Sequence, residues 1–350
     1  MEEFARSMTT SEKLRLGIVG LGGHGRTIQA SIANCESIEV VSVCDTSASE
    51  RQRSENVFGC FGTDSFDALL ERGGLDAIAI NTPNHLHLEQ VSKALEAGLH
   101  VLVEKPIANS MADGLAMVEL AEKTGRLLMV GHHMRYNRAS RKVKELIDSG
   151  ECGSIVTMEM HFSANNTPNI PADAWRLQPE YCPLLPVTQL GIHGVDLVHY
   201  FVSRVSDVFA AARSVTVKSP IVDSVTAVMS TEDGPLVTLT CNYCTPVLFE
   251  CRFAMTRKNI VFTPHSVAVS PVNGMEGDDS EWESFDFRDD RRDGYDSEVC
   301  HFADAVLNGA KLETDGRVGL QALAVDECMR NSIAKEARVS VPDFVSPVGS

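Results

Sequence analysis

The stretch that decides the fold lies near the N-terminus and reads LRLGIVGLGGHG from Leu14 to Gly25. Its first half, Leu14–Val19, is an apolar run as long as a typical strand, and a helical pattern follows over Gly23–Ala33. The glycines between them have the spacing Gly-x-Gly-x-x-Gly, which permits a tight turn, close approach of the backbone to a ligand, and packing of the helix on the strand. A helix N-terminus favours anions, so this stretch predicts a site for the pyrophosphate of a dinucleotide. The residues expected to contact it are Gly20, Gly22, Gly23, His24 and Gly25.

Asp45 follows the second apolar run, Glu39–Val43, at the place where a carboxylate would bind the ribose hydroxyls of the adenosine. A carboxylate there accepts a hydrogen bond from the 2′-hydroxyl and repels a 2′-phosphate, so Asp45 favours NAD over NADP. Arg51 and Arg53 lie close by in the sequence and leave NADP as the second choice.

The chain has two patterns of apolar residues. Up to about residue 150, short apolar runs alternate with helical segments, which is typical of βαβ units and a parallel sheet. After Gly153 apolar residues recur at every second position, which indicates a mainly antiparallel sheet. We therefore expect an α/β part followed by an α+β part. The first is an NAD(P)-binding Rossmann domain with a doubly wound parallel sheet over residues 10–132. The second, over residues 133–345, holds the mainly antiparallel sheet, and its closing helices can pack back on the first domain.

Composition narrows the classes of partner. The chain of 350 residues has 31 Lys and Arg against 48 Asp and Glu, a net charge of −17, which repels phosphate backbones and argues against nucleic acid. No apolar run is long enough to span a bilayer, and the N-terminus has no secretory pattern, so we expect no membrane association and a cytoplasmic protein. Ten cysteines scattered through apolar stretches fit reduced thiols. Cys241 and Cys244 lack a second pair, so no metal is expected.

A further set of motifs follows the predicted strands and opens the mid-chain helix. In order they are Asn81-Thr82-Pro83-Asn84-His85, Glu104-Lys105-Pro106, Gly131-His132-His133-Met134-Arg135-Tyr136, Gly191-Ile192-His193-Gly194-Val195-Asp196, and Tyr295-x-x-Glu298 with Phe302. With the glycine turn, these motifs make the chain, from about Leu14 to Val341, resemble the family of glucose-fructose oxidoreductase, inositol dehydrogenase and rhizopine-catabolism proteins (Gfo/Idh/MocA). The resemblance implies a Rossmann domain, an open sheet domain, and an active site between them. By the same resemblance, the second domain, residues 133–345, is expected to bind the substrate and to mediate oligomerisation.

The resemblance also implies a dehydrogenase that moves a hydride between nicotinamide and a secondary hydroxyl of a sugar, sugar derivative or cyclitol. Such chemistry needs a base for the hydroxyl proton, and His193 is the best candidate because its ordinary pKa lies near neutrality. Lys105 would polarise the same oxygen and stabilise alkoxide charge. Many relatives have an aspartate where this chain has Gln189, whose amide can bind a hydroxyl but cannot accept a proton. The expected catalytic residues are Lys105, His193 and Gln189.

Other residues are expected in the site by their place in the resemblance. Trp175 could stack on a ring or fill an interface, and Arg176 could meet a carboxylate or a diol. The expected substrate contacts are Lys105, Trp175, Arg176, Gln189, His193 and Tyr295. The expected cofactor contacts beyond the glycine turn and Asp45 are Thr82, Pro83, Asn84, His87, Glu104, Lys105 and His133.

Two other functions remain open from the sequence. One is an NAD-using glycosidase or lyase that oxidises its substrate transiently and then reduces it again, for which Gln189 leaves room. The other is a non-catalytic NAD-binding sensor, although such a protein would need neither Lys105 nor His193. The resemblance further implies a homodimer or homotetramer, because the outer face of the open sheet commonly packs against a partner.

Overall fold

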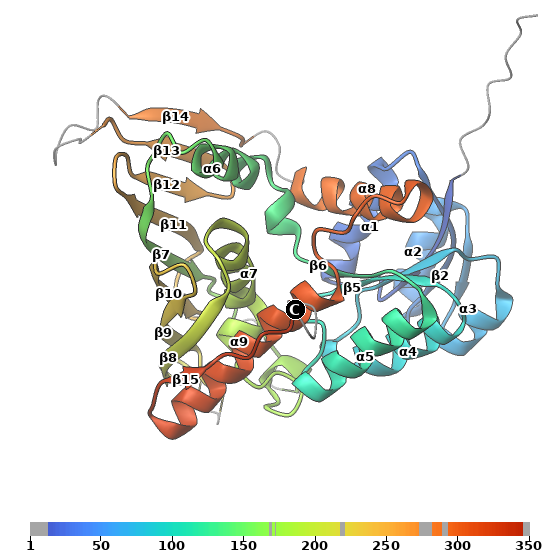
Figure 1. Cartoon of the computed structure of the whole chain (residues 1–350). Coiled ribbons are helices and arrows are strands. Elements are labelled where there is room, and N and C mark those ends of the chain that lie inside the picture. Colours follow the sequence, from blue (N-terminus) through green and yellow to red (C-terminus); the bar gives the residue numbers. More distant parts are fainter. Residues whose placement is uncertain are drawn as a thin grey trace, which may run out of the picture.

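The computed structural model describes residues 13–167, 170–171, 173–217, 221–272, 282–288 and 293–345. Two sheets lie side by side, with helices on both faces of the first and on one face of the second (Figure 1). This arrangement confirms the expected parallel Rossmann sheet followed by an open, mainly antiparallel sheet. The boundary between residues 132 and 133 stays a prediction, and residues 10–12 of the expected first domain lie outside the described residues.

The first sheet is formed by six parallel strands in the order β3-β2-β1-β4-β5-β6. The strands are β1 (Leu14–Val19), β2 (Ile38–Cys44), β3 (Phe61–Thr63), β4 (Ala77–Ile80), β5 (His100–Glu104) and β6 (Leu128–Gly131). The helices are α1 (His24–Asn34), α2 (Ala48–Phe58), α3 (Phe66–Arg72), α4 (His87–Glu96), α5 (Met111–Thr124) and α6 (Arg138–Asp148). Because the order reverses between β1 and β4, the carboxyl ends of the strands open a crevice there.

The second sheet has the order β14-β13-β12-β11-β7-β10-β9-β8-β15. Its strands are β7 (Ile155–Ser163), β8 (Val205–Arg213), β9 (Ser224–Thr231), β10 (Leu236–Asn242), β11 (Leu248–Met255), β12 (Ile260–Thr263), β13 (Ser266–Val269), β14 (Glu283–Asp286) and β15 (Val339–Ser340). Neighbours pair antiparallel except β7 and β10, which pair in parallel. A parallel pair needs a long connection, and the segment from Ala164 to Pro235 supplies it.

Three helices complete the chain: α7 (Ile192–Phe201), α8 (Asp293–Asn308) and α9 (Gly316–Lys335). Helix α8 lies across α1, and α9 runs between the two sheets, where it contacts β8 and α7 on one side and α5 and β6 on the other (Figure 1). A Cβ at Gly319 would lie 2.5 Å from Cγ2 of Val130, so only glycine lets α9 come this close to β6. The closing helices therefore pack on the first sheet, and they hold the two sheets together around the site.

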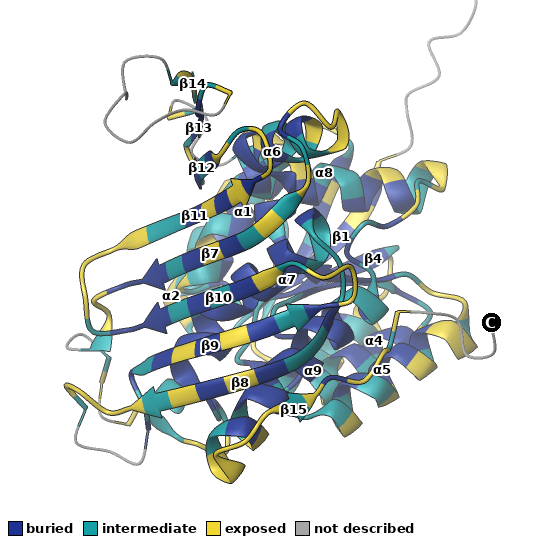
Figure 2. Cartoon of the chain, turned by 60° about the vertical axis from the view of Figure 1, so that its left-hand side comes forward, coloured by how far each residue is buried: buried dark blue, intermediate teal, exposed yellow. Residues whose placement is uncertain are grey.

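The outer face of the second sheet carries large apolar side chains in contact with solvent (Figure 2). One lies on each of five neighbouring strands: Val156, Phe209, Val228, Leu236 and Leu248. A homo-oligomer that covers this face stays a prediction. Among the described residues, no helix is both long enough and apolar enough to cross a membrane.

Candidate active site

The glycine turn has the geometry that a dinucleotide requires. Gly20 has a φ of +81°, and a Cβ there would lie 2.7 Å from the carbonyl carbon of Asn81. A Cβ at Gly25 would lie 2.1 Å from the carbonyl oxygen of Gly20, so α1 can pack against the turn only with glycine there. No side chain caps the start of α1. The N–H groups of Gly25 and Arg26 donate to the carbonyl oxygens of Gly22 and Gly23, whereas among the described residues nothing accepts from the N–H of His24, which remains available to an anion. The turn therefore fits the pyrophosphate of NAD.

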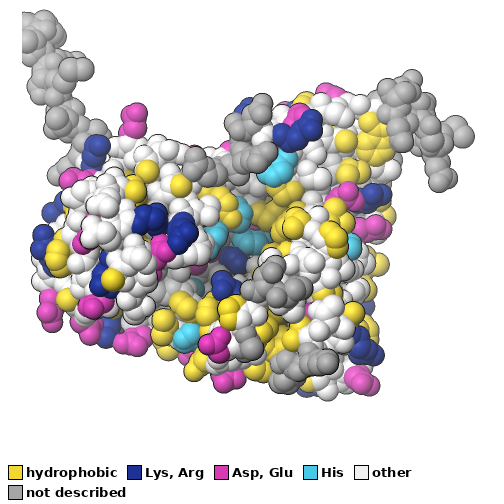
Figure 3. Space-filling view, turned by 180° about the vertical axis from the view of Figure 1, so that it is seen from behind, with side chains coloured by type: hydrophobic (Ala, Val, Ile, Leu, Met, Phe, Trp, Pro, Cys, Tyr) yellow, Lys and Arg dark blue, Asp and Glu magenta, His cyan; other side chains and the backbone are white. Residues whose placement is uncertain are grey.

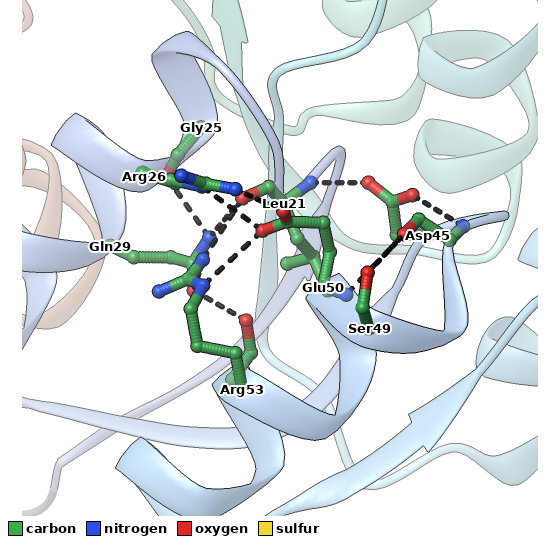
Figure 4. A network of polar contacts seen from close by, with 10 residues as sticks. Leu21, Gly25, Arg26, Gln29, Asp45, Ser49, Glu50 and Arg53 are labelled. Carbon is green, nitrogen blue, oxygen red and sulfur yellow. Dashed lines mark hydrogen bonds and ion pairs between the residues drawn. The ribbon is translucent and has the colours of Figure 1, made fainter.

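Asp45 lies at the end of β2 and faces the turn (Figure 4). Its carboxylate accepts hydrogen bonds from the backbone N–H of Leu21 at 2.7 Å and of Ser47 at 2.8 Å. A carboxylate can accept about four hydrogen bonds, so Asp45 retains capacity for ribose hydroxyls. Arg51 and Arg53, the two arginines that kept NADP as the second choice, both donate to protein groups. Arg51 donates to the carbonyl oxygen of Asp45, and Arg53 donates to the carbonyl oxygen of Leu21 and to the Glu50 carboxylate.

The carboxyl ends of β4, β5 and β6 meet the second sheet at a cavity of about 700 Å³. In Figure 3 this region is a hollow between the two halves of the molecule, in which histidine and Lys or Arg side chains gather. All the predicted catalytic and substrate residues line the cavity: Lys105, Trp175, Arg176, Gln189, His193 and Tyr295. The predicted cofactor residues His24, Thr82, Asn84, Glu104 and His133 line it as well.

Lys105 and His193 reach this cavity from different parts of the chain. The ammonium of Lys105, just beyond β5, donates to the backbone carbonyl oxygen of Gln189 at 2.8 Å. Gln189 lies in a π-helical turn, Val187–Gly191, that leads directly into α7. The first turn of α7 holds His193, which is 6% exposed and whose Nδ1 has no hydrogen-bond partner among the described residues. The turn thus brings the lysine close to the start of the helix that carries the imidazole.

Burial and neighbouring charges set the protonation states of these groups. Burial lowers the pKa of His193 well below its ordinary 6.5, and the Lys105 ammonium lowers it further, so the imidazole is neutral at pH 7. Burial also lowers the pKa of Lys105 from 10.5; Glu104 opposes this effect and Arg176 adds to it. Burial alone would raise the pKa of Glu104, yet His24 and Lys105 bring it to about 2. Glu104 is therefore a carboxylate, and its Oε1 lies 2.9 Å from Nε2 of His24.

Contacts between neighbouring side chains fix two of the polar groups that line the cavity. Arg176 lies over the ring of Trp175 at 4.4 Å and donates from Nε to the side-chain oxygen of Gln189 at 3.3 Å. From α8, Tyr295 stacks on His133 with 3.8 Å between the ring centroids. Trp175 therefore orients the guanidinium, and Tyr295 fixes the orientation of His133.

Outside the glycines of the turn and Asp45, which lie beyond the cavity, two more predicted cofactor residues, Pro83 and His87, do not line it. Pro83 precedes the short helix Asn84–Leu86, and His87 is 1% exposed at the start of α4. The His87 imidazole lies 3.1 Å from the carbonyl oxygens of both Thr82 and Pro106. Because its ring nitrogens face the backbone, His87 holds the segments after β4 and β5 together rather than facing a ligand.

Several residues of the site had no role in the sequence analysis. Arg135 and Asp196, 7% and 0% exposed, form an ion pair at 2.7 Å and sit on η2 (His133–Tyr136) and α7 behind the cavity. Glu298 is fully buried, and neither carboxyl oxygen has a partner among the described residues. Burial and the charge of Glu104 raise the pKa of Glu298 well above its ordinary value, which favours the protonated form. All three residues lie within the quoted motifs, but the motifs alone show no pairing.

Asn137, Asn166, Tyr243 and His265 also line the cavity, and no sequence signal marked them. They lie on segments as distant as η2, the loop after β7, the end of β10 and the β12–β13 turn. Only the packing of the second sheet on the first brings them together. Among the described residues, no cluster of three or more His, Cys, Asp or Glu side chains could hold a metal ion.

Comparisons with known proteins agree with this geometry. A family model described as an oxidoreductase family with an NAD-binding Rossmann fold matches residues 14–132, and a GFO/IDH/MocA C-terminal domain model matches residues 140–261. The chain is 31% identical over 155 residues to dTDP-3,4-didehydro-2,6-dideoxy-alpha-D-glucose 3-reductase of Streptomyces violaceoruber, and this match covers 44% of this chain and 45% of the relative. It is 29% identical over 196 residues to inositol 2-dehydrogenase of Salmonella typhimurium, and that match covers 55% of each chain. The chain thus matches about half the length of these two relatives.

Among solved structures, a levoglucosan dehydrogenase in complex with NADH and levoglucosan superposes with a TM-score of 0.87 at 20% identity. That match covers 95% of this chain and the whole of the other, so the fold is shared over nearly the full length. With two family models that together span residues 14–132 and 140–261, the protein belongs to the Gfo/Idh/MocA family of oxidoreductases and has its NAD-binding Rossmann fold.

Proposed function

We propose that the protein is an NAD-dependent dehydrogenase that transfers a hydride between the nicotinamide and a secondary hydroxyl of a sugar, sugar derivative or cyclitol. The observation that carries the proposal is the convergence of Lys105 and His193 on one cavity, which His24 connects to the glycine turn. The names of the two relatives, a sugar reductase and an inositol dehydrogenase, support the same reaction class.

The site residues have separate roles in such a reaction. Bound NAD would supply the acceptor for the hydride that leaves the carbinol carbon. His193, neutral at pH 7, accepts the hydroxyl proton, and the ammonium of Lys105 stabilises the negative charge that develops on the oxygen. Gln189 holds Lys105 through its backbone carbonyl, and its side-chain amide cannot take up the proton. The relay therefore consists of the imidazole and the ammonium.

The proposal is tested by incubating the purified protein with NAD and a panel of sugars, sugar acids and inositols, and following the absorbance of the reduced nicotinamide. We expect sustained reduction with at least one compound. Tightly bound cofactor with product formed but no net reduction would instead favour the transient-oxidation enzyme. Nucleotide binding without conversion of any compound would favour the sensor, and either result would contradict the proposal.

Asp45 is expected to set the choice of NAD over NADP. Asp45→Asn removes the charge that repels a 2′-phosphate. The NH₂ group of the new asparagine would face the backbone N–H of either Leu21 or Ser47, so one of these two hydrogen bonds would be lost. We expect the Kd for NAD to rise about tenfold, the cost of roughly one hydrogen bond to a charged group, while the NADP-to-NAD ratio of Kd values falls. Calorimetric titration with both nucleotides measures this. Asp67→Asn, an exposed carboxylate on α3, is the control. Tighter binding of NADP than NAD by the unmodified protein would contradict the assignment.

The pH dependence of kcat/KM for alcohol oxidation should report both relay groups. The pKa of His193 is lowered, so its base form is lost only as pH falls below 6.5. The pKa of Lys105 is also lowered, so its cation is lost as pH rises toward a value below 10.5. We expect a bell with its acid limb centred below 6.5 and its alkaline limb below 10.5. Lys105→Arg, whose cation does not titrate in this range, should lose the alkaline limb. An acid midpoint above 6.5, or an alkaline limb kept in Lys105→Arg, would contradict these roles.

A further inference from the structure

The cavity holds two cations that no protein carboxylate pairs with. Lys105 and Arg176 line it, and among the described residues neither forms an ion pair. Of the residues that the structure describes, two acids line the same cavity, Glu104 and Asp293. The Glu104 oxygens are taken by His24 and by the backbone N–H of Lys105, and Asp293 accepts from backbone N–H groups of Arg138 and Gly294. Both carboxylates are therefore bound to other donors, and Lys105 and Arg176 keep their charges available to a ligand.

Both cations contact the same residue. The Lys105 ammonium donates to the backbone carbonyl oxygen of Gln189 at 2.8 Å, and Arg176 Nε donates to its side-chain oxygen at 3.3 Å. Both acceptors are neutral. In the described part of the chain no carboxylate contacts either cation, and Glu104 acts on the Lys105 ammonium only as a nearby charge. The positive charge is therefore only partly compensated in a partly buried site, which is costly. Among the described residues nothing accepts from the two terminal NH₂ groups of Arg176, so the guanidinium has donors left for an anion.

The orientation of Arg176 also suits a planar anion. Its guanidinium lies 4.4 Å from the centroid of the Trp175 ring, and the Nε contact to Gln189 restrains it further. A guanidinium held in this way presents a fixed pair of donors, which matches the two oxygens of a carboxylate. Because Lys105 is required at the reacting oxygen, Arg176 is the cation left for an anion elsewhere on the substrate, and one guanidinium balances a monoanion better than a phosphate dianion.

We propose that the substrate is a sugar acid, a polyhydroxy carboxylic acid whose carboxylate binds Arg176 while a hydroxyl a few bonds away meets Lys105 and His193. The inference rests on the proposed function and adds its substrate class. Gln189 is then the residue that determines this specificity. Its side chain is neutral and lies between the two cations, so their positive charge is neutralised by the substrate carboxylate rather than by the protein. The outer part of the sugar would face neutral groups of the cavity such as Asn166 and Tyr243.

The test compares acids with neutral partners of nearly the same shape: D-gluconate with D-glucitol, D-glucuronate with D-glucose, and D-galacturonate with D-galactose, each with NAD. We expect kcat/KM for at least one acid to exceed that of its partner about 100-fold, the factor for a bidentate, charge-assisted hydrogen bond. Equal or better oxidation of the neutral partners would overturn the inference and leave the dehydrogenase standing. Preference for glucose 6-phosphate would also overturn it. Failure of every compound in these pairs and in the wider panel would count against the proposed function itself.

Two variants test the site independently of each other. Gln189→Glu places a carboxylate between the cations and should lower the acid-to-neutral ratio of kcat/KM at least about tenfold, because the protein then supplies the counter-ion. Arg176→Gln should lower the same ratio by a similar factor through a higher KM for the acid. Arg213→Gln, an exposed arginine on β8, is the matched control and should leave the ratio unchanged. An unchanged ratio in both site variants would contradict the inference.

A binding measurement gives a readout that does not depend on turnover. With NADH present, calorimetry should show D-gluconate binding more tightly than D-glucitol to the unmodified protein, and Gln189→Glu should remove the difference. Thermal melts of both variants check that each is folded. If Arg176→Gln fails to fold, the Gln189→Glu result decides alone, and an undiminished preference for the acid would reject the proposal.

Discussion

Replacing Lys105 with methionine is expected to reduce kcat about 1000-fold, the upper range for loss of one donor that stabilises a developing oxyanion. Methionine is similar in length and shape but has no charge and cannot donate to the reacting oxygen. The Kd for NAD should change less than about threefold, because the pyrophosphate is expected at the amides of α1, away from this side chain. Steady-state kinetics and nucleotide titration measure the two effects.

The same variant should keep its thermal stability. The Lys105 ammonium is partly buried without a carboxylate partner, so removing its charge removes a desolvation cost along with one hydrogen bond to Gln189. Lys93→Met, an exposed lysine on α4 that pairs with Asp67, is the control for loss of a lysine charge. Turnover of Lys105→Met within about tenfold of the unmodified protein would refute the electrostatic role of Lys105.

Replacing His193 with glutamine is expected to reduce kcat/KM at pH 7 by about 1000-fold, within the range for loss of a general base. Glutamine is polar and of similar size but cannot accept the hydroxyl proton. The acid limb of the pH profile should disappear, which separates loss of a base from a general disturbance of the site. A profile that keeps its acid limb would assign the base to another group.

The matched control is His100→Gln. His100 begins β5, at the opposite end of the strand from Lys105, and its Nδ1 accepts a hydrogen bond from the backbone N–H of Leu127. A glutamine oxygen can take over that contact, and activity should stay within about twofold because the residue lies far from the strand ends where ligands bind. A large loss of activity in His100→Gln would mean that substitutions in this sheet disturb the fold. The pH profile of His193→Gln would then decide whether that variant has lost a base.

Local patterns predicted the first domain well. The apolar runs Leu14–Val19 and Ala77–Ile80 and the helical pattern Phe66–Arg72 predict β1, β4 and α3 with the bounds that the structure has. Each has a local stop or start signal: Gly20 and Asn81 follow the two strands, and Ser65 caps the helix. The short edge strand β3, only three residues long, gave no periodic signal.

The start of α2 shows how far such a local signal holds. Ser47 and Glu50 have the Ser-x-x-Glu spacing that predicts a capping box. The Ser47 side chain accepts from the N–H of Glu50 as predicted, but the Glu50 carboxylate pairs with Arg26 and Arg53 instead of reaching back.

The second domain was predicted less completely, for a physical reason. Apolar residues alternate over 155–162, 208–215, 224–230, 236–243, 249–255 and 266–270, which predicts β7 through β11 and β13. The strands β12, β14 and β15 are too short for alternation to stand out. A helical pattern over Glu298–Leu307 predicts the core of α8, whereas the acidic composition of residues 276–296 predicts a loop. The helix instead begins within that stretch, at Asp293. Its position there is set by contact with α1 and with the segment after β6, which no local pattern encodes.

The sequence by itself determined the glycine turn, Asp45 at the end of β2 and Lys105 at the end of β5, because each depends only on chemistry within a few residues of a strand end. Only the tertiary structure decided that Lys105 contacts Gln189, that Arg176 bonds the same glutamine, and that His87 turns away from the cavity into the backbone. These contacts join segments far apart in the chain. They exist because α7 and α9 pack the second sheet against the carboxyl ends of the first, and the free energy of that packing comes from the whole interface rather than from any one motif.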